Sequence, residues 1–156
     1  MSKATQILNH ARARNLRIAT AESCTGGLIA AALTEIPGSS DVVEGGLVTY
    51  SNSMKIEFLG ADPETLETYG AVSEPIAREM ADGGLRRTGA DICVSVTGIA
   101  GPGGSEHKPE GMVCFGLAQI GKPTVTFTVQ FGALGRQEVR QATVDHAFDL
   151  LLQRLE

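Results

Sequence analysis

Residues 19–27 read Ala-Thr-Ala-Glu-Ser-Cys-Thr-Gly-Gly and join two segments of different character. The apolar, β-favouring residues Leu16 and Ile18 come before this stretch, and an Ala- and Leu-rich run typical of a helix follows it. The junction therefore predicts a strand that turns directly into a helix. Such a turn holds a hydroxyl group clear of the sheet, and the free amides of the following helix favour negative charge beside it.

Ser23 stands at this turn and is the first candidate nucleophile. A serine before a helix is also a common N-cap, and a Gly-Gly pair can be only a tight turn. The surroundings do not match a hydrolase nucleophile elbow, which has glycines where this chain has Ala21 and Thr25. They also lack the Gly-Lys-Ser/Thr of a phosphate-binding P-loop. Nucleophile and helix cap therefore both stay open for Ser23.

Length and composition limit the class of protein. A chain of 156 residues fits one domain, residues 1–156, which can bury a core without disulfides or a structural metal. The net charge of −5 disfavours binding to nucleic acid. The three cysteines form no CxxC pair, so we expect reduced thiols of a cytoplasmic protein, with Cys93 and Cys114 in the core. The uncharged run of residues 24–34 is too short to span a bilayer, and no membrane partner is expected.

Helical and strand-like patterns alternate along the chain. The predicted helices cover residues 4–15, 26–34, 51–59, 62–70, 73–89 and 137–155, and the predicted strands cover 16–21, 42–50, 92–96, 112–120 and 124–131. Residues 121–123, Gly-Lys-Pro, are typical of a hairpin loop between the last two strands. The pattern predicts a single-domain α/β fold, a three-layer sandwich in which a mixed β-sheet is flanked by helices. One face of the last predicted helix should pack against the core. Its residues include Val139, Thr143, Ala147, Leu150 and Leu151.

Hydroxyl and amine groups follow three of the predicted strands. Ser23 follows the first, Tyr50 ends the second with Ser51 and Lys55 shortly after it, and Thr97 with a glycine-rich loop follows the third. Ligands of open α/β sheets bind at the carboxyl ends of the strands. These groups are therefore candidates for one site.

A serine nucleophile needs a base, and Lys55 is the most plausible one. The three histidines, His10, His107 and His146, have no neighbouring pattern that indicates a catalytic triad. Lys55 can accept a proton near neutral pH only if burial or a nearby cation lowers its pKa from about 10.4. Ser51 lies four residues before Lys55 on the same predicted helical face, so it competes with Ser23 as nucleophile.

Two further features of the sequence are suited to bind a negatively charged group. Thr97 and the loop 98–109 could present a hydroxyl and backbone amides to an oxyanion or a phosphate. This loop is not a dinucleotide fingerprint, because Glu106 stands where the third glycine would be. Arg136 and Arg140 are four residues apart on the last helix and could clamp an anionic group, while pairing with surface acids is the alternative for either one alone.

Together these segments resemble the nicotinamide-nucleotide amidases, the family also known as the C-terminal domain of the competence/damage-inducible protein CinA. The resemblance spans nearly the whole chain and rests on motifs in the family's order and spacing: residues 21–27, 48–52 with Lys55, 70–75, 97–102 and 108–109. It implies hydrolysis of the carboxamide of nicotinamide mononucleotide to nicotinic acid mononucleotide and ammonia, in salvage of pyridine nucleotides. It implies no metal and no cofactor, and a homodimer that acts on a small nucleotide. Two-domain proteins also occur in the family, and we expect this domain to act alone.

The resemblance also implies roles for individual residues. By position, Ser23 is the nucleophile, Lys55 its base, Tyr50 a supporting hydroxyl and Thr97 a stabiliser of the oxyanion. The candidates for substrate binding are Thr25, Gly26, Gly27, Gly98, Gly101, Lys108, Arg136 and Arg140.

The alternative is a non-catalytic nucleotide- or anion-binding module, in which Ser23 and Thr97 only cap helices. A Lys55 amine within hydrogen-bond reach of the Ser23 hydroxyl would favour the enzyme.

Overall fold

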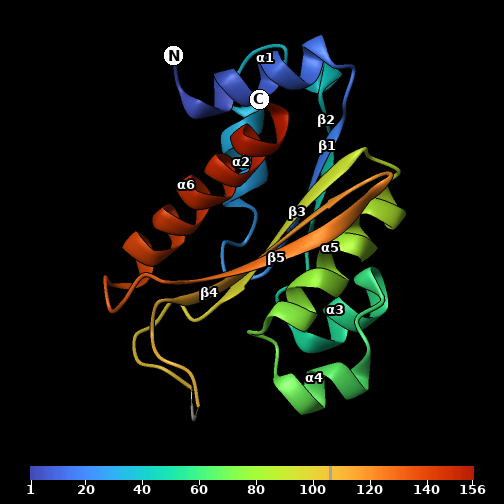
Figure 1. Ribbon diagram of the computed structural model, residues 1–156. Helices are drawn as coiled ribbons and strands as arrows, with labels where there is room; N and C mark the ends of the chain where they lie inside the picture. The colour runs from blue at the N-terminus through green and yellow to red at the C-terminus, as the bar shows by residue number, and fades with distance from the viewer. Residues whose placement is uncertain (106) are drawn as a thin grey trace.

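A five-stranded sheet runs through the computed structural model, which describes residues 1–105 and 107–156 (Figure 1). The strands are β1 (Ile18–Glu22), β2 (Val43–Val48), β3 (Ile92–Gly98), β4 (Met112–Gln119) and β5 (Lys122–Gln130). Their order in the sheet is β2-β1-β3-β4-β5. The strands β2, β1 and β3 are parallel, whereas β4 and β5 are antiparallel to their neighbours. The predicted mixed sheet is confirmed.

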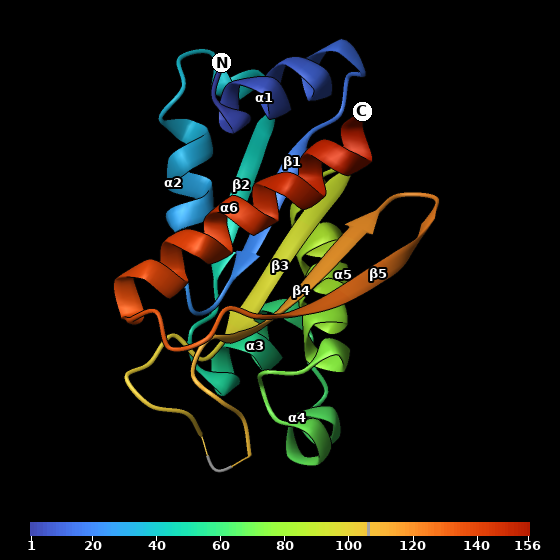
Figure 2. The ribbon, with the colours of Figure 1, turned by 60° about the vertical axis from the view of Figure 1, so that its left-hand side comes forward.

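Helices cover both faces of this sheet. They are α1 (Lys3–Ala13), α2 (Leu28–Thr34), α3 (Asn52–Leu59), α4 (Pro63–Tyr69), α5 (Glu74–Thr88) and α6 (Arg136–Leu155), with a short 3-10 helix at Ser39–Asp41. Figure 2 shows α6 in front of the sheet, with α1 and α2 on its side, and α5 behind the sheet. The predicted three-layer α/β sandwich is therefore confirmed.

Alternate residues of the strands face the two helical layers. Ile18 and Val94 pack with α1, α2 and α6, whereas Ala19 and Cys93 pack on the side of α5. The predicted core face of α6 is buried, as are the free thiols of Cys93 and Cys114. Within the described residues, no helix is long and apolar enough to cross a membrane.

Several predicted boundaries differ from the structure: β2 ends at Val48 and not at residue 50, β3 continues to Gly98, and two further differences have a clear physical reason. The hairpin loop is a two-residue turn at Ile120 and Gly121, because Lys122 and Pro123 already belong to β5. Pro123 is tolerated there since β5 is an edge strand, where a missing N–H costs little. The second helix begins at Leu28, because Gly26 and Gly27 have φ values of 59° and 106° and form the turn that precedes it. Glu106, in the predicted glycine-rich loop, lies outside the described residues.

The parallel register brings three strand ends to one edge of the sheet. Glu22, the last residue of β1, pairs with Val48 of β2 and with Val96 of β3. The segments that follow these strands therefore leave the sheet side by side, next to α3. The candidate residues after each strand meet at this edge, as the sequence predicted.

Candidate functional site

Ser23 and Lys55 are in direct contact at this edge. The Lys55 Nζ atom lies 2.9 Å from Ser23 Oγ and donates to it. Two backbone carbonyls, of Thr49 at 2.9 Å and Tyr50 at 3.0 Å, accept the other hydrogen bonds of the amine. The amine is therefore held in a fixed orientation toward the serine.

The position of Ser23 follows from the pairing of β1 with β3. The Ser23 amide donates to Val96 O at 3.1 Å and continues the ladder by one residue, while its own carbonyl accepts from Gly26 at 3.0 Å. The chain thus turns sharply after Ser23, and the side chain is left at the end of the strand. The Ser23 hydroxyl accepts no capping hydrogen bond from the amides of α2, so the predicted strand-to-helix turn serves to present this hydroxyl to Lys55.

Glu22 caps the helix that Ser23 does not cap. Its carboxyl group is fully buried and accepts hydrogen bonds from the N–H groups of Ile29 at 2.9 Å and Ala30 at 3.0 Å. It also accepts from the hydroxyls of Thr25 at 2.5 Å and Thr20 at 3.3 Å. An acidic group is favoured at a helix N-terminus, so Glu22 fixes α2 and the turn around Ser23. No role was predicted for Glu22 from the sequence, although an acidic residue shortly before a helix is itself a capping signal.

Burial changes the acid–base behaviour of Lys55. Only 1% of its surface is exposed, and removal of the ammonium group from water lowers the pKa of Lys55 to about 8. Among the described residues no carboxylate forms an ion pair with Lys55 to oppose this effect. A substantial fraction of Lys55 is therefore neutral near physiological pH, as a general base requires.

The competing nucleophile Ser51, and the neighbouring thiol of Cys24, have other surroundings. Ser51 is the N-cap of α3, where its Oγ accepts from the Met54 amide at 3.2 Å. Lys55 is thus paired with Ser23 and not with Ser51. Cys24 is adjacent to Ser23, but burial raises the pKa of its thiol to about 12, which leaves it protonated at neutral pH.

A small cavity of about 180 Å³ opens beside the Ser23–Lys55 pair. It is lined by residues from the strand ends, by Ala71 and Val72 before α5, and by Arg136 at the start of α6. Arg136 closes one side, because its guanidinium donates to the Tyr50 hydroxyl at 2.9 Å and to Gly101 O at 2.7 Å. Tyr50 is therefore at the rim, bound to Arg136 and 60% exposed.

The remaining predicted site residues fall into three groups. Thr97 and Gly98 line the cavity, and the Thr97 hydroxyl donates to Ala71 O at 2.9 Å. Arg140 and Lys108 instead bind backbone carbonyls. Arg140 donates to the carbonyls of Cys24 at 3.1 Å and Thr25 at 3.2 Å. Lys108 donates to those of Tyr69 and Val72. Gly26 and Gly27 form the turn before α2, and Gly101 is the partner of Arg136.

Fold and site together define an α/β protein with a buried serine–lysine pair at the carboxyl ends of its parallel strands. The chain belongs to the CinA C-terminal domain family, whose model matches residues 1–155. It is 52% identical over 144 residues to a CinA-like protein of Mycobacterium avium (strain 104), covering 89% of this chain and 33% of that protein. A CinA-like protein of Chlorobaculum tepidum is 58% identical over 113 residues, covering 72% of this chain and 27% of the relative.

Solved structures of similar size have the same fold. The competence/damage-inducible protein CihA of Agrobacterium tumefaciens aligns with a TM-score of 0.94 at 47% identity, over 97% of this chain and 92% of that one. The competence damage-inducible protein A (ComA) of Klebsiella pneumoniae aligns with a TM-score of 0.94 at 37% identity, over 98% and 94% of the two chains. The chain thus spans a third or less of the two curated relatives but nearly the full length of these structures.

Proposed function

We propose that the chain is an amidase that hydrolyses the carboxamide of nicotinamide mononucleotide to nicotinic acid mononucleotide and ammonia. The single observation that carries this proposal is the buried contact of 2.9 Å between Lys55 Nζ and Ser23 Oγ. Family membership supports the same reaction through the resemblance to nicotinamide-nucleotide amidases.

The first half of the reaction forms an ester on Ser23. Neutral Lys55 keeps two N–H groups on the carbonyls of Thr49 and Tyr50, and its lone pair faces the Ser23 hydroxyl. Lys55 takes the hydroxyl proton while Oγ attacks the carboxamide carbon. The tetrahedral intermediate collapses when the C–N bond breaks, and the proton on Lys55 passes to the leaving nitrogen, which departs as ammonia.

The second half regenerates the serine. Water attacks the ester carbon and gives a proton to Lys55, and the bond between that carbon and Ser23 Oγ then breaks. Lys55 returns the proton to Oγ, and the product leaves as a carboxylic acid that ionises in water. Lys55 thus serves as base and acid in each half, which requires a pKa near the working pH.

Backbone amides at the strand ends are suited to stabilise the oxyanion. The Ile99 amide donates to Met112 O of β4 at 2.9 Å. Because successive residues of a strand point their N–H groups to opposite edges, the Gly98 amide faces the side of β1 and Ser23. We therefore assign the oxyanion contact to the Gly98 amide, since the Thr97 hydroxyl already donates to Ala71 O.

The test is release of ammonia from nicotinamide mononucleotide by the purified protein, measured together with binding of the nucleotide. The proposal predicts turnover that Lys55→Met abolishes while thermal unfolding stays cooperative. Binding of the nucleotide without any ammonia would contradict the proposal and would favour the non-catalytic binding module.

The homodimer expected from the resemblance stays a prediction. A molar mass in solution close to twice that of the chain would support it, and the mass of one chain would contradict it.

A further inference from the structure

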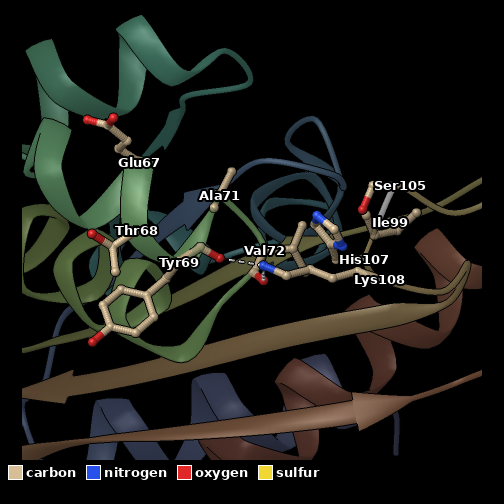
Figure 3. Close-up of a pocket in the computed structure, with 10 residues that line it drawn as sticks. Glu67, Thr68, Tyr69, Ala71, Val72, Ile99, Ser105, His107 and Lys108 are labelled. Atoms are coloured by element: carbon tan, nitrogen blue, oxygen red, sulfur yellow. Dashed lines mark hydrogen bonds between the residues drawn. The ribbon is translucent and has the colours of Figure 1, made fainter.

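A second and larger cavity lies next to the one at Ser23 (Figure 3). Its volume is about 700 Å³, and its walls come from the end of α4, the segment before α5, and the loop between β3 and β4. It contains none of the proposed catalytic residues Ser23, Lys55 and Tyr50.

The two cavities share walls. Ala71 and Val72 line both of them, and Ile99 lines the large cavity while its neighbours Gly98 and Ala100 line the small one. Ligand pockets of proteins typically measure about 300–1,000 Å³. The small cavity, at about 180 Å³, is below this range, whereas the large one is within it. The small cavity therefore suits only the reacting end of a nucleotide, and the rest needs a neighbouring space.

The large cavity carries a fixed positive charge. The Lys108 amine donates to the carbonyls of Tyr69, at 2.6 Å, and Val72, which hold it at the wall (Figure 3). A lysine amine has three N–H groups, so one is left for a ligand. Ser105 and His107 lie on the same loop, and the acidic Glu67 is at the opposite end of the cavity.

We propose that this second cavity binds the ribosyl phosphate of the substrate, with Lys108 as the positive charge that meets the phosphate. The inference rests on the proposed function, because it assumes that the carboxamide of the same molecule lies at Ser23. Lysine is a common ligand of phosphate, which it binds as a point charge. Lys108 would then discriminate between a nucleotide and the corresponding nucleoside.

The experiment compares nicotinamide mononucleotide with nicotinamide riboside, which lacks only the phosphate. In Lys108→Met, kcat/KM for the mononucleotide should fall at least about tenfold more than kcat/KM for the riboside, because only the former loses a charge-assisted hydrogen bond. A merely structural role of Lys108 would lower both values equally, and that result would overturn the proposal. Lys122→Met, an exposed lysine of β5, is the matched control and should leave the ratio unchanged.

A second variant tests whether the nucleotide occupies the large cavity. Thr68 is exposed at the end of α4 and lines the large cavity, so Thr68→Trp should fill it without disturbing the core. The dissociation constant of the mononucleotide should rise at least about tenfold, whereas Glu64→Trp, on the same helix but outside the cavity, should leave it unchanged. Unaltered binding by Thr68→Trp would overturn the proposal.

The two proposals fail in different ways. If the wild type releases no ammonia from either compound, the amidase proposal fails. Titration calorimetry of the same two compounds with wild type and Lys108→Met then decides the phosphate site, since binding needs no turnover. Equal affinity of the wild type for both compounds would overturn the phosphate site alone.

Discussion

The Nζ atom of Lys55 lies 2.9 Å from the Oγ atom of Ser23, although the two residues are 32 positions apart in the chain. Both are nearly inaccessible to water, with exposed fractions of 1% for Lys55 and 7% for Ser23. A buried amine without a carboxylate partner favours its neutral form. The contact therefore joins a hydroxyl to a group able to remove its proton.

The pH dependence of the reaction follows from the lowered pKa of Lys55. The neutral amine is the active form, and its fraction increases as pH rises through about 8. We expect kcat/KM for nicotinamide mononucleotide to rise about tenfold per pH unit below that value and to level off above it. Initial rates of ammonia release between pH 6 and 10 measure this. A profile that falls as pH rises through 8 would rule out neutral Lys55 as the base.

Substitution of Glu22 tests its capping of α2. In Glu22→Gln one acceptor oxygen becomes an NH2 group, which faces the donors of Ile29, Ala30 or Thr25 and cannot accept from them. We expect a loss of about 1–3 kcal/mol in the free energy of unfolding and a lower Tm by calorimetry. Glu57→Gln, an exposed position of α3, should change neither. An unchanged Tm in Glu22→Gln would show that the cap contributes little.

Two adjacent glycines of β2 should respond in opposite ways to alanine. A Cβ atom at Gly46 would lie 2.4 Å from Thr20 Oγ1 and 3.3 Å from Ala30 Cβ, whereas one at Gly45 meets no atom within 4 Å. Gly46→Ala should therefore destabilise the protein by about 1–3 kcal/mol through overpacking. Gly45→Ala should be neutral or slightly stabilising, because it reduces the entropy of the unfolded chain. Denaturant unfolding of both variants measures the difference, and equal stabilities would argue against this packing of α2 on β2.

Arg136 joins the rim of the small cavity to α6. In Arg136→Ala the hydrogen bonds to the Tyr50 hydroxyl and to Gly101 O are lost, and that side of the cavity opens. We expect kcat/KM to fall by about tenfold or more, since positioned groups at the mouth of a site fix the substrate. Tyr50→Phe removes only the first of these bonds and should have a smaller effect. The reverse order of effects would indicate that the Tyr50 hydroxyl acts directly on the substrate.

Much of the fold could be predicted from the sequence because its signals are local. The spacing of apolar residues, the capping residues and the glycines predicted the helices, the strands and the turn at Ser23. The structure confirms the mixed sheet. The boundaries near Leu28 and Pro123 were wrong because positive φ angles and the edge position of β5 are set by tertiary structure.

The partners of the site residues could be predicted less well. The sequence indicated Lys55 as a base but left Ser51 and Ser23 open, because only the register of β1 with β2 and β3 decides which serine meets it. Lys108 and Arg140 were predicted as candidates for substrate binding, but their hydrogen bonds to backbone carbonyls were not predicted. Contacts between a side chain and a distant carbonyl leave no pattern in the sequence.

The most direct test of the account is the rate of ammonia release from nicotinamide mononucleotide by Ser23→Ala, measured beside Ser51→Ala. The account predicts that Ser23→Ala lowers kcat by at least about a thousandfold with an unchanged Tm, while Ser51→Ala stays within about tenfold of the wild type. Substantial turnover by Ser23→Ala, or loss of turnover only in Ser51→Ala, would contradict Ser23 as the nucleophile.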